Sequence, residues 1–385
     1  MRGARAIFIL TGVTILLIIS LAVLFFPSVF QTKYTAASLP QGISSNTEQN
    51  TEMPVTHLPT PEPLKAIYMT ACVASTPSWR ESLKSLIDTT ELNAIVIDIK
   101  DYTGSVTFEA GANCYVSSLK EFITALHQSG IYVIGRISVF QDPSYTSLFP
   151  ELAVKSISTG GVWKDHKGLS FIDVGAKPYW GYIVEISEKS YALGFDELNY
   201  DYVRYPSDGN MQDVHYSWTP ATTTKPEMLE SFFAYLYDNL QTYKLQDLKT
   251  SVDLFGMTTT VTSDMGIGQV LELALPYFDY VSPMVYPSHY PPSWNGFANP
   301  AEYPYDVIKL AMSEGKRREE VLNISLGIAT STPSKLRPWL QDFNLGATYT
   351  PEMVRAQIQA TYDSGLTSWM LWSAANKYTQ EALGH

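Results

Sequence analysis

Three polar residues, Glu197, Asn199 and Asp201, alternate along the run 195–203, which also contains Asp196 on the opposite face. Because successive side chains of a strand point to opposite faces, these three share one face. Burying such a row is costly unless the groups are hydrogen-bonded or used in chemistry. Pro206 then ends the run, since proline cannot donate to a strand ladder. We expect a functional site at the carboxyl end of this strand; the alternative is an edge strand whose acids are solvated.

Paired carboxylates beside aromatic side chains suit glycoside hydrolysis. One carboxylic acid protonates the leaving oxygen, while the other attacks the sugar, activates water or stabilises an oxocarbenium-like transition state. We expect Asp201 to be the leading catalytic carboxylate and Asp253 or Glu197 to be its partner. The structural alternatives are an ion pair of Asp201 with Arg204 and one of Asp253 with Arg136.

Further polar and aromatic residues at predicted strand ends form the expected substrate-binding set. Charged and amide groups hydrogen-bond sugar hydroxyls, and Trp and Tyr rings offer flat apolar faces with a polar edge. The set is Asp98, Lys100, Arg136, Asn199, Arg204, Tyr286, His289, Trp339, Asp342 and Trp372. The structural alternatives are that Lys100 pairs with Asp98 or Glu197, and that Trp372 is an ordinary core residue. Weaker candidates are Trp163, Asp165 and His166.

Several other chemistries lack their motifs. The sequence has no phosphate-cradling Gly-rich loop, no nucleophile-elbow GxSxG and no HExxH. The six histidines are scattered without metal-ligand spacing, so we expect no metal and no cofactor. The missing His/Asp cluster also disfavours a polysaccharide deacetylase or another metal hydrolase.

Charge and cysteine content restrict the partners. The formal net charge is −12 (26 − 38), which argues against nucleic acid, because nucleic-acid binding needs a basic face. The chain has two cysteines, Cys72 and Cys114. They are either unrelated small buried residues or, in an extracytoplasmic chain, a disulfide.

The elements that must position these residues are strand-like runs alternating with helical segments. The runs are 66–72, 94–99, 131–137, 195–203, 250–255, 279–286, 336–340 and 368–373. Helices are expected at 78–89, 117–129, 177–193, 225–243 and 351–364. This alternation predicts a single α/β domain, a (β/α)8 TIM barrel over residues 64–385, with its site at the carboxyl ends of the strands.

Two details of the barrel need a decision that the pattern leaves open. The apolar run 321–328 competes with 336–340 for the seventh strand. The connection after the third strand, roughly 140–176, is long enough to carry extra structure over the barrel mouth.

Two segments precede the barrel. Residues 1–30 contain Arg2 and Arg5 followed by an almost uncharged apolar run, which predicts a cytoplasmic tip and a transmembrane anchor with the barrel outside the cytoplasm. The alternative is a signal peptide cleaved near 35–37, giving a secreted protein. Residues 31–63 are rich in Ser, Thr and Pro and predict a flexible linker.

Four motifs carry a family resemblance. Phe-Asp-Glu at 195–197 with Asp-Tyr-Val-Arg-Tyr-Pro at 201–206, Pro-Met-Val-Tyr-Pro-Ser-His-Tyr at 283–290, Arg-Pro-Trp-Leu-Gln-Asp-Phe at 337–343 and Trp-Met-Leu-Trp at 369–372 stand in order along the chain. They resemble a bacterial family of glycosyl hydrolase barrel domains found in secreted or anchored proteins. The match covers about 64–379. It implies hydrolysis of an extracellular or cell-wall polysaccharide; the alternative is a non-catalytic carbohydrate-binding or cell-wall scaffold barrel.

A more distant similarity is to family-18 chitinase-like barrels, which place acids at alternate positions of strand four, Met-x-Tyr on strand six and a Trp at the end of strand eight. Here the alternating row is Glu197, Asn199 and Asp201, and the other positions correspond to Met284, Tyr286 and Trp372. The acidic row departs from that pattern, because it ends in Asp and has Asn in its middle. Related glycosidase barrels imply a cis peptide between Trp372 and Ser373 that aims the Trp ring into the cleft.

Overall fold

The computed structural model describes residues 55–329 and 331–384. The expected anchor at 1–30 and residues 31–54 of the expected linker lie outside this part. Among the described residues, no helix combines the length and apolar character needed to cross a bilayer. Residues 55–63 belong to the expected linker but contact the folded domain. The Leu58 amide donates to Asp196 Oδ1 at 2.6 Å, and the His57 ring stacks on the Tyr191 ring with centroids 4.0 Å apart.

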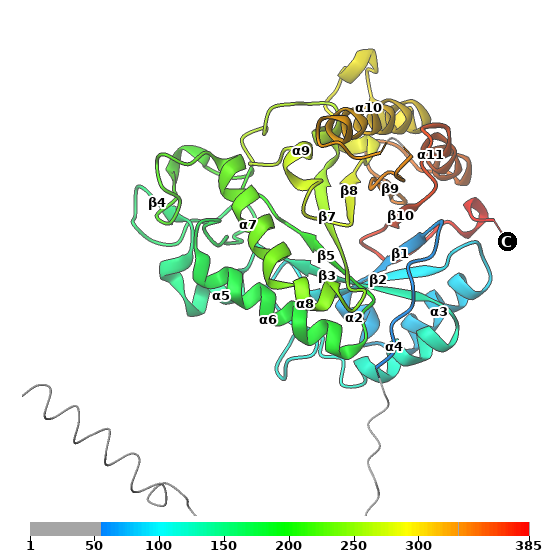
Figure 1. Ribbon diagram of the computed structural model, residues 1–385, viewed down its shortest axis with the longest axis horizontal. Coiled ribbons are helices and arrows are strands. Elements are labelled where there is room, and N and C mark those ends of the chain that lie inside the picture. The colour runs from blue at the N-terminus through cyan, green and yellow to red at the C-terminus, as the bar shows by residue number, and fades with distance from the viewer. Residues whose placement is uncertain (1–54, 330, 385) are drawn as a thin grey trace, which may run out of the picture. The chain divides into compact units, whose positions relative to one another are not determined.

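Eight parallel strands close into a barrel (Figure 1). In sequence order they are β1 (Lys65–Met69), β2 (Ala94–Lys100), β3 (Tyr132–Ser138), β5 (Glu197–Asp201), β7 (Lys249–Phe255), β8 (Tyr280–Met284), β9 (Trp339–Gln341) and β10 (Trp369–Trp372). Each strand pairs with its neighbour around the ring, and β1 closes it by pairing with both β2 and β10. The predicted TIM barrel is therefore confirmed.

Helices follow the strands and cover the outside of the barrel (Figure 1). The longer ones are α3 (Pro77–Asp88), α4 (Leu119–Gln128), α6 (Lys177–Leu193), α7 (Lys225–Asn239), α10 (Pro304–Ser325) and α11 (Pro351–Asp363). The shorter ones are α2 (Ala71–Ala74), α5 (Pro143–Leu148), α8 (Gln241–Lys244) and α9 (Leu271–Ala274). The predicted helix 177–193 has the observed bounds of α6.

The seventh barrel strand is the run at 336–340 rather than the one at 321–328. Leu336 bridges to Val281 of β8, and β9 follows at Trp339. Most of the competing run 321–328 belongs to the last turns of α10, where several of its apolar side chains are exposed. An apolar run of that length fits either element, and only pairing with β8 separates the two cases.

The local sequence explains how the chain passes from α6 into β5. Gly194 ends the helix in the left-handed conformation, with φ 113°, which glycine adopts without the steric penalty of a Cβ. Three residues later β5 begins, with Glu197 opposite Ile134 and Asp201 opposite Ser138 of β3. This register sets Glu197 near the amino end of the barrel and Asp201 at its carboxyl end.

The apolar residues form two layers. The barrel interior is filled by buried side chains that include Tyr68, Val96, Ile134 and Trp339. The alternate residues of the same strands pack outward against the helices, as Leu198 and Tyr200 of β5 do. The predicted alternation of β5 is confirmed, because Asn199 hydrogen-bonds Asp253 inside the barrel while its neighbours Leu198 and Tyr200 join the outer layer.

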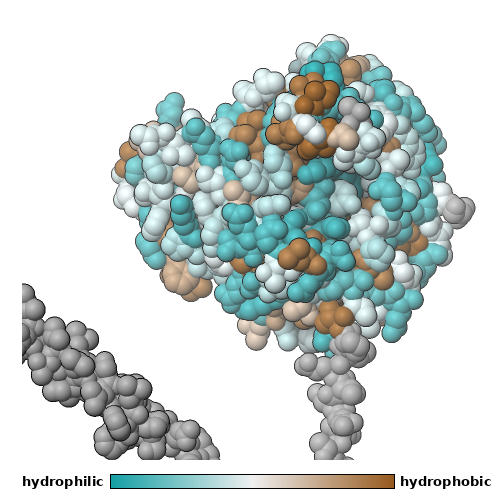
Figure 2. All heavy atoms as spheres, in the orientation of Figure 1, coloured by the Kyte–Doolittle hydropathy of each residue, from teal (hydrophilic) through white to brown (hydrophobic). Residues whose placement is uncertain are grey.

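The long connection after β3 does carry extra structure, as the sequence predicted. It contains α5 and the short strand β4 (Lys155–Ser156), which pairs antiparallel with β6 (Val214–His215) from the connection after β5. The pair lies at one side of the barrel (Figure 1, left). The face in Figure 2 is mainly hydrophilic, and its largest apolar group lies near α10.

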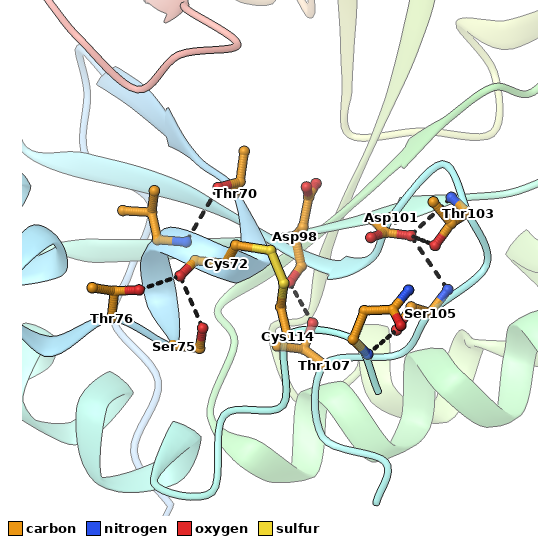
Figure 3. The surroundings of a disulfide bond; sticks show 12 residues. Thr70, Cys72, Ser75, Thr76, Asp98, Asp101, Thr103, Ser105, Thr107 and Cys114 are labelled. Atoms are coloured by element: carbon orange, nitrogen blue, oxygen red, sulfur yellow. Dashed lines mark hydrogen bonds between the residues drawn. A yellow bond between two sulfur atoms is a disulfide. The ribbon is translucent and has the colours of Figure 1, made fainter. Parts of the chain in front are cut away.

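Cys72 and Cys114 form a disulfide with a Cα–Cα distance of 4.8 Å (Figure 3). The bond joins α2, which follows β1, to the connection that follows β2. The turn after β2 is also held by Asp101, whose Oδ1 accepts hydrogen bonds from the Thr103 amide and hydroxyl at 2.8 and 2.6 Å. Both strand connections thus meet the barrel mouth as ordered segments.

Candidate active site

A cavity of about 270 Å³ opens at the carboxyl ends of the strands. This volume is near the lower end of the range of roughly 300–1,000 Å³ found for ligand pockets. Its walls combine charged and aromatic side chains: Arg136, Asp201, Tyr202, Arg204, Asp253, Phe255, Met257, Met284, Tyr286, His289, Tyr290 and Trp372. The site therefore has the position expected for a barrel of this class.

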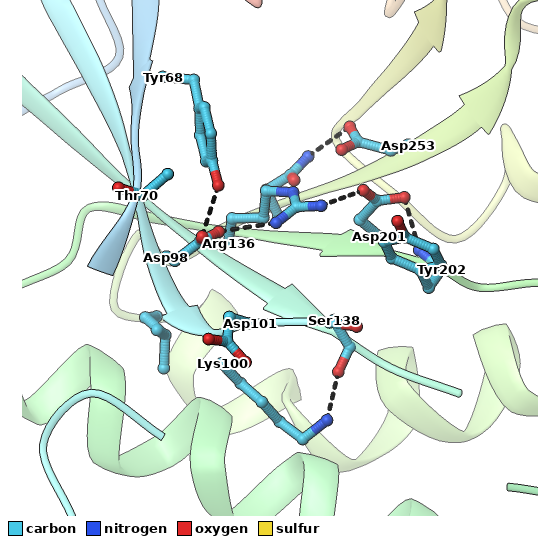
Figure 4. Close-up of polar contacts among 12 residues, drawn as sticks. Tyr68, Thr70, Asp98, Lys100, Asp101, Arg136, Ser138, Asp201, Tyr202 and Asp253 are labelled. Carbon is cyan, nitrogen blue, oxygen red and sulfur yellow. Dashed lines mark hydrogen bonds and ion pairs between the residues drawn. The ribbon is translucent and has the colours of Figure 1, made fainter. Parts of the chain in front are cut away.

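Asp201 is held at the carboxyl end of β5 by a buried arginine. The Arg136 guanidinium of β3 donates to Asp201 Oδ2 and, through its other terminal nitrogen, to Asp98 Oδ1 at 2.7 Å (Figure 4). Burial by itself lowers the pKa of Arg136, but Asp201 and Asp98 outweigh it and raise that pKa further above its usual value. The guanidinium therefore stays charged, and its bonds to Asp201 and Asp98 hold both side chains in place.

The residue after Asp201 has a strained backbone. Tyr202 is in the left-handed region, with φ 53°, which costs a bulky residue free energy. In this conformation its amide donates to Asp201 Oδ1 at 2.5 Å, and its side chain forms part of the cavity wall. The strained turn thus supplies a second hydrogen bond to the Asp201 carboxylate.

Asp253 lies across from Asp201, at the carboxyl end of β7. It is 1% exposed, and burial together with the neighbouring charge of Asp201 raises its pKa to about 8. Its Oδ1 accepts hydrogen bonds from Asn199 Nδ2 at 2.8 Å and from Trp339 Nε1 at 2.9 Å. No other described residue donates to Oδ2, so the proton of the neutral acid belongs on Oδ2. Near neutral pH Asp253 is therefore a carboxylic acid.

Aromatic rings surround the arginine. Tyr68 stacks on Trp372 with ring centroids 4.0 Å apart, and Trp339 meets Trp372 edge-on at 5.5 Å. The Arg136 Cζ lies 5.5 Å from the Tyr68 ring centroid and 5.1 Å from that of Trp372. The Tyr68 hydroxyl donates to Asp98 Oδ2 at 2.5 Å. Trp372 is the ring of this group that lines the cavity.

The opposite wall comes from the segment after β8. Tyr286 is buried, and its ring meets His289 edge-on at 5.1 Å. Gly256, directly after β7, lies against the end of β8, since a Cβ at this position would stand 2.4 Å from the Met284 carbonyl oxygen. Close approach of the two strand ends places Asp253 beside the 284–290 wall.

The structure brings seven of the thirteen predicted site residues to the cavity wall. They are Asp201, Asp253, Arg136, Arg204, Tyr286, His289 and Trp372. Three others lie directly behind that wall: Asp98 bonds Arg136, and Asn199 and Trp339 bond Asp253. The expected alternatives Asp201–Arg204 and Asp253–Arg136 are not the observed hydrogen-bonded pairs.

The structure does not bring Glu197 to the cavity. Its carboxylate is completely buried and accepts hydrogen bonds from Arg337 rather than Lys100. Four residues separate Glu197 from Asp201, which is about 13 Å along a strand. The shared face that the sequence predicts is real, but it runs the depth of the barrel, so only its carboxyl end reaches the mouth.

Lys100 and Asp342 also lie outside the cavity wall. The register of β2 shifts between Asp98 and Lys100, and the Lys100 ammonium bonds the Ser138 carbonyl and Asp142 at 2.6 and 2.9 Å. Figure 4 shows Lys100 pointing away from Asp98 and Arg136. The irregularity removes Lys100 from the face it was expected to share with Asp98. Asp342 instead accepts two hydrogen bonds from Thr379.

The expectation of a cis peptide between Trp372 and Ser373 is wrong. Among the described residues the cis bond is Glu62–Pro63. Trp372 nevertheless lines the cavity, because stacking on Tyr68 holds its ring.

Sequence reasoning missed two site residues. Tyr202 belongs to the motif at 201–206, but no sequence pattern indicates that its backbone is in the left-handed conformation. Tyr68 lies near the carboxyl end of β1. Its place on the inward face of that strand was the one sequence feature that indicated a role in the site. In the part of the chain that the structure describes, no group of three or more His, Cys, Asp or Glu side chains is arranged to hold a metal ion.

Comparisons with known proteins place this site in context. The family model described as "Putative glycosyl hydrolase domain" matches residues 66–378, which confirms the resemblance expected from the motifs. No curated protein sequence matches the chain. A hypothetical protein from Ruminiclostridium thermocellum is 31% identical over 49% of this chain and 96% of its own, with a TM-score of 0.42.

Two larger enzymes share the fold. Alpha-L-fucosidase isoenzyme 2 from Paenibacillus thiaminolyticus is 10% identical, with a TM-score of 0.55, over 84% of this chain and 47% of that one. A dextranase from Flavobacterium johnsoniae is 9% identical, with a TM-score of 0.50, over 83% of this chain and 38% of that one. This chain spans less than half the length of either enzyme, and the likeness concerns the barrel alone.

Proposed function

Since the chain belongs to the family described as "Putative glycosyl hydrolase domain", we propose that it is a glycoside hydrolase that cleaves an extracellular or cell-wall polysaccharide. The observation that carries the proposal is the unequal pair of carboxyl groups, Asp253 with its pKa raised to about 8 and Asp201 clamped by Arg136. Two acids in different protonation states at one cavity are the requirement of glycosidic bond cleavage.

Asp253 is the general acid in this proposal. A carboxylic acid that keeps its proton near neutral pH can transfer that proton to the glycosidic oxygen as the bond to the anomeric carbon breaks. Asn199 and Trp339 hold Oδ1, which leaves the protonated Oδ2 to face the leaving group.

Asp201 is the carboxylate of the pair. It either bonds to the anomeric carbon, giving a covalent intermediate that water later hydrolyses, or removes a proton from the attacking water. Arg136 and the Tyr202 amide orient its two oxygens. The anomeric configuration of the first product, read by proton NMR, separates the two routes: retention indicates the covalent route and inversion the water route.

The remaining wall binds the sugar. Trp372 and Tyr286 provide aromatic surface, and Arg204 and His289 provide polar groups for hydroxyls. The proposed location is outside the cytoplasm, with the barrel held at the membrane by residues 1–30 through the linker 31–63. The Cys72–Cys114 disulfide supports this location, because disulfides persist mainly in oxidising compartments.

The test of the function is Asp201→Asn in the full-length protein, assayed with a panel of polysaccharides for release of reducing sugar. The change keeps shape and most hydrogen bonding and removes the charge. We expect the variant to fold, to bind the glycan that the wild type cleaves, and to lose most turnover.

Two outcomes contradict the proposal. Undiminished turnover in Asp201→Asn would remove Asp201 from the mechanism. If the wild type and the variant bind one glycan equally and neither cleaves any member of the panel, the protein is a carbohydrate-binding barrel rather than an enzyme.

A further inference from the structure

A second cavity, of about 310 Å³, adjoins the catalytic one. Tyr202 and Arg204 line both cavities and form the wall between them. The rest of the second cavity comes from connections above the barrel: Tyr102 after β2, Gln141, Asp165 and Lys167 after β3, and Ser207 and Asp208 after β5. Of these six residues, Asp165 was a weaker sequence candidate, and the other five were not among the expected catalytic or substrate-binding residues.

We infer that this second cavity is a sugar subsite, so that the substrate is a neutral glycan of at least two units lying across Tyr202 and Arg204. The inference rests on the proposed function for the class of ligand. It adds the side of the barrel mouth on which the chain continues, the aromatic platform that holds it, and its lack of charge.

The platform is Tyr102. Its side chain is 52% exposed although it lines the cavity, and an exposed ring on a concave wall offers a sugar an apolar face to stack on. The segment that carries it is ordered. The Gln141 side chain donates to the Tyr102 carbonyl at 3.2 Å, the Ser144 amide and hydroxyl both donate to the Thr103 carbonyl, and the Cys72–Cys114 disulfide ties down the same connection. An ordered platform loses little entropy when a ligand binds.

Arg204 is the shared hydrogen-bond donor. Its Nη1 donates to the Tyr205 carbonyl and to the Ser207 hydroxyl, both at 3.1 Å, and its Cζ lies 5.5 Å from the Tyr202 ring centroid. These contacts fix the guanidinium, while Nε and Nη2 have no partner among the described residues. Two oriented nitrogen donors at the boundary of two cavities suit the oxygen atoms between consecutive sugar units.

The charges of the second cavity cancel. Arg204 and Lys167 supply two positive charges, and Asp165 and Asp208 supply two negative charges. Asp165 is partly committed, because its Oδ1 accepts the Lys167 and Leu169 amides at 2.9 and 2.8 Å. A wall with no net charge and many polar groups matches the hydroxyls of a neutral sugar, whereas a uronate or sulfated sugar would need an uncompensated cation.

The strain at Tyr202 fits the same interpretation. Its left-handed backbone joins the catalytic carboxylate to the wall between the cavities, so one residue both bonds Asp201 and separates the two sugar positions. Strained residues gather where a structure needs a side chain in a position that relaxed backbone does not give.

The experiment measures binding without turnover, in full-length Asp253→Asn protein. The probes are cellotriose, maltotriose, xylotriose and chitotriose, each with its monosaccharide methyl glycoside, and trigalacturonate as the charged probe; affinities are read by calorimetry. Tyr102→Ala is added to this background, and Tyr115→Ala is the matched control. Tyr115 lies in the same connection and is 47% exposed, but it lines neither cavity.

We expect at least one neutral trisaccharide to bind and Tyr102→Ala to raise its Kd about tenfold, the scale of one lost aromatic contact area. The methyl glycoside of the same sugar should bind equally to both proteins, and Tyr115→Ala should change neither affinity. The inference is overturned if Tyr102→Ala leaves the trisaccharide affinity unchanged, if it weakens the monosaccharide equally, or if trigalacturonate is the one probe that binds.

This result is separable from the proposed activity. Trisaccharide binding that depends on Tyr102, in a protein whose wild type cleaves none of the probes, keeps the subsite and removes the enzyme. Cleavage by the wild type with no effect of Tyr102→Ala keeps the enzyme and removes the subsite.

Discussion

The strand β5 carries a buried carboxylate at each end, and each is bonded to a buried arginine from another strand or loop. At the amino end Glu197 accepts from Arg337, and at the carboxyl end Asp201 accepts from Arg136. The two pairs share a strand face, a barrel interior and the same type of bond. They differ in how many charges are present and in what lies above them.

At the amino end the charges match one to one. Glu197 also accepts from the Tyr132 hydroxyl at 3.4 Å, and the Tyr280 ring centroid lies 4.4 Å from the Arg337 Cζ. A cavity of about 280 Å³ at this end is lined by Arg337 and Tyr280, whereas Glu197 is completely buried and does not line it. In a balanced pair of this kind there is no surplus negative charge that would keep a proton on the carboxyl group.

At the carboxyl end three carboxyl groups share one guanidinium. Asp98, Asp201 and Asp253 all act on Arg136, and the surplus negative charge, added to burial, keeps a proton on Asp253. The cavity opens on these groups. A buried ion pair can therefore take part in proton transfer when its charges are unequal and a ligand can reach them.

The largest expected difference between the two ends is in turnover. Asp253→Asn removes the proposed proton donor, so kcat should fall by about 10²–10⁴-fold, the usual contribution of a general acid. Glu197→Gln should leave kcat per folded molecule within a few-fold of wild type, because its carboxylate does not reach the cavity. Reducing-sugar release, normalised to folded protein by circular dichroism, checks both. Equal losses in the two variants would mean that the amino end also acts in catalysis.

The next largest difference is in stability, with the order reversed. Glu197→Gln leaves Arg337 buried without a counter-charge, which should cost about 3–5 kcal/mol in the free energy of unfolding. Asp201→Asn should cost less, because Arg136 keeps its bond to Asp98 and the cavity admits water. Urea unfolding of the three proteins at one pH measures this. A larger loss of unfolding free energy in Asp201→Asn than in Glu197→Gln would contradict the proposed difference between the two ends.

A third difference is in pH dependence. The folded pKa of Asp253, about 8, is above the unfolded value of about 3.9, so its neutral form favours the folded state at low pH. The advantage is complete below about pH 4 and is lost as pH rises to about 8, at up to roughly 1.4 kcal/mol per pH unit. The free energy of unfolding of wild type minus that of Asp253→Asn should therefore decrease from pH 4 to 8 and then level off.

Unfolding curves at several pH values measure this difference. Glu197→Gln is the control, since replacing a carboxylate outside the cavity leaves Asp253 free to titrate. A wild-type minus Asp253→Asn difference that stays constant with pH would show that Asp253 ionises in the ordinary range, and the two ends of β5 would then be alike.

The smallest expected effect concerns the carboxyl end alone. Trp339→Phe removes a hydrogen bond that lowers the pKa of Asp253, so that pKa should rise further and the alkaline limb of the kcat/KM profile should move to higher pH by up to about one unit. Trp369→Phe is the matched control, because that indole donates to the Tyr362 hydroxyl on the helical side. A shift of the limb in both variants would point to general loosening of the barrel rather than to the bond with Asp253.

Much of this architecture follows from sequence. Strand-like and helix-like runs alternate with periods close to two and 3.6 residues, so the barrel, the bounds of α6 and the inward face of β5 are predictable. The site residues at strand ends, such as Asp201, Asp253 and Trp372, follow from the rule that working groups gather at the carboxyl face. These inferences depend on local periodicity and on one property of the fold.

Tertiary structure alone decided the rest. Arg337 is the partner of Glu197 because the register of the strands brings the two together. Lys100 does not share a face with Asp98 because the pairing of β2 with β3 contains a local irregularity. Asp253 keeps its proton because burial and the charge of Asp201 raise its pKa, and both arise only when β5 and β7 meet in the closed barrel. Residue type and spacing along the chain determine which side chains face inward, while pKa values and pairings depend on distances between segments that the sequence does not contain.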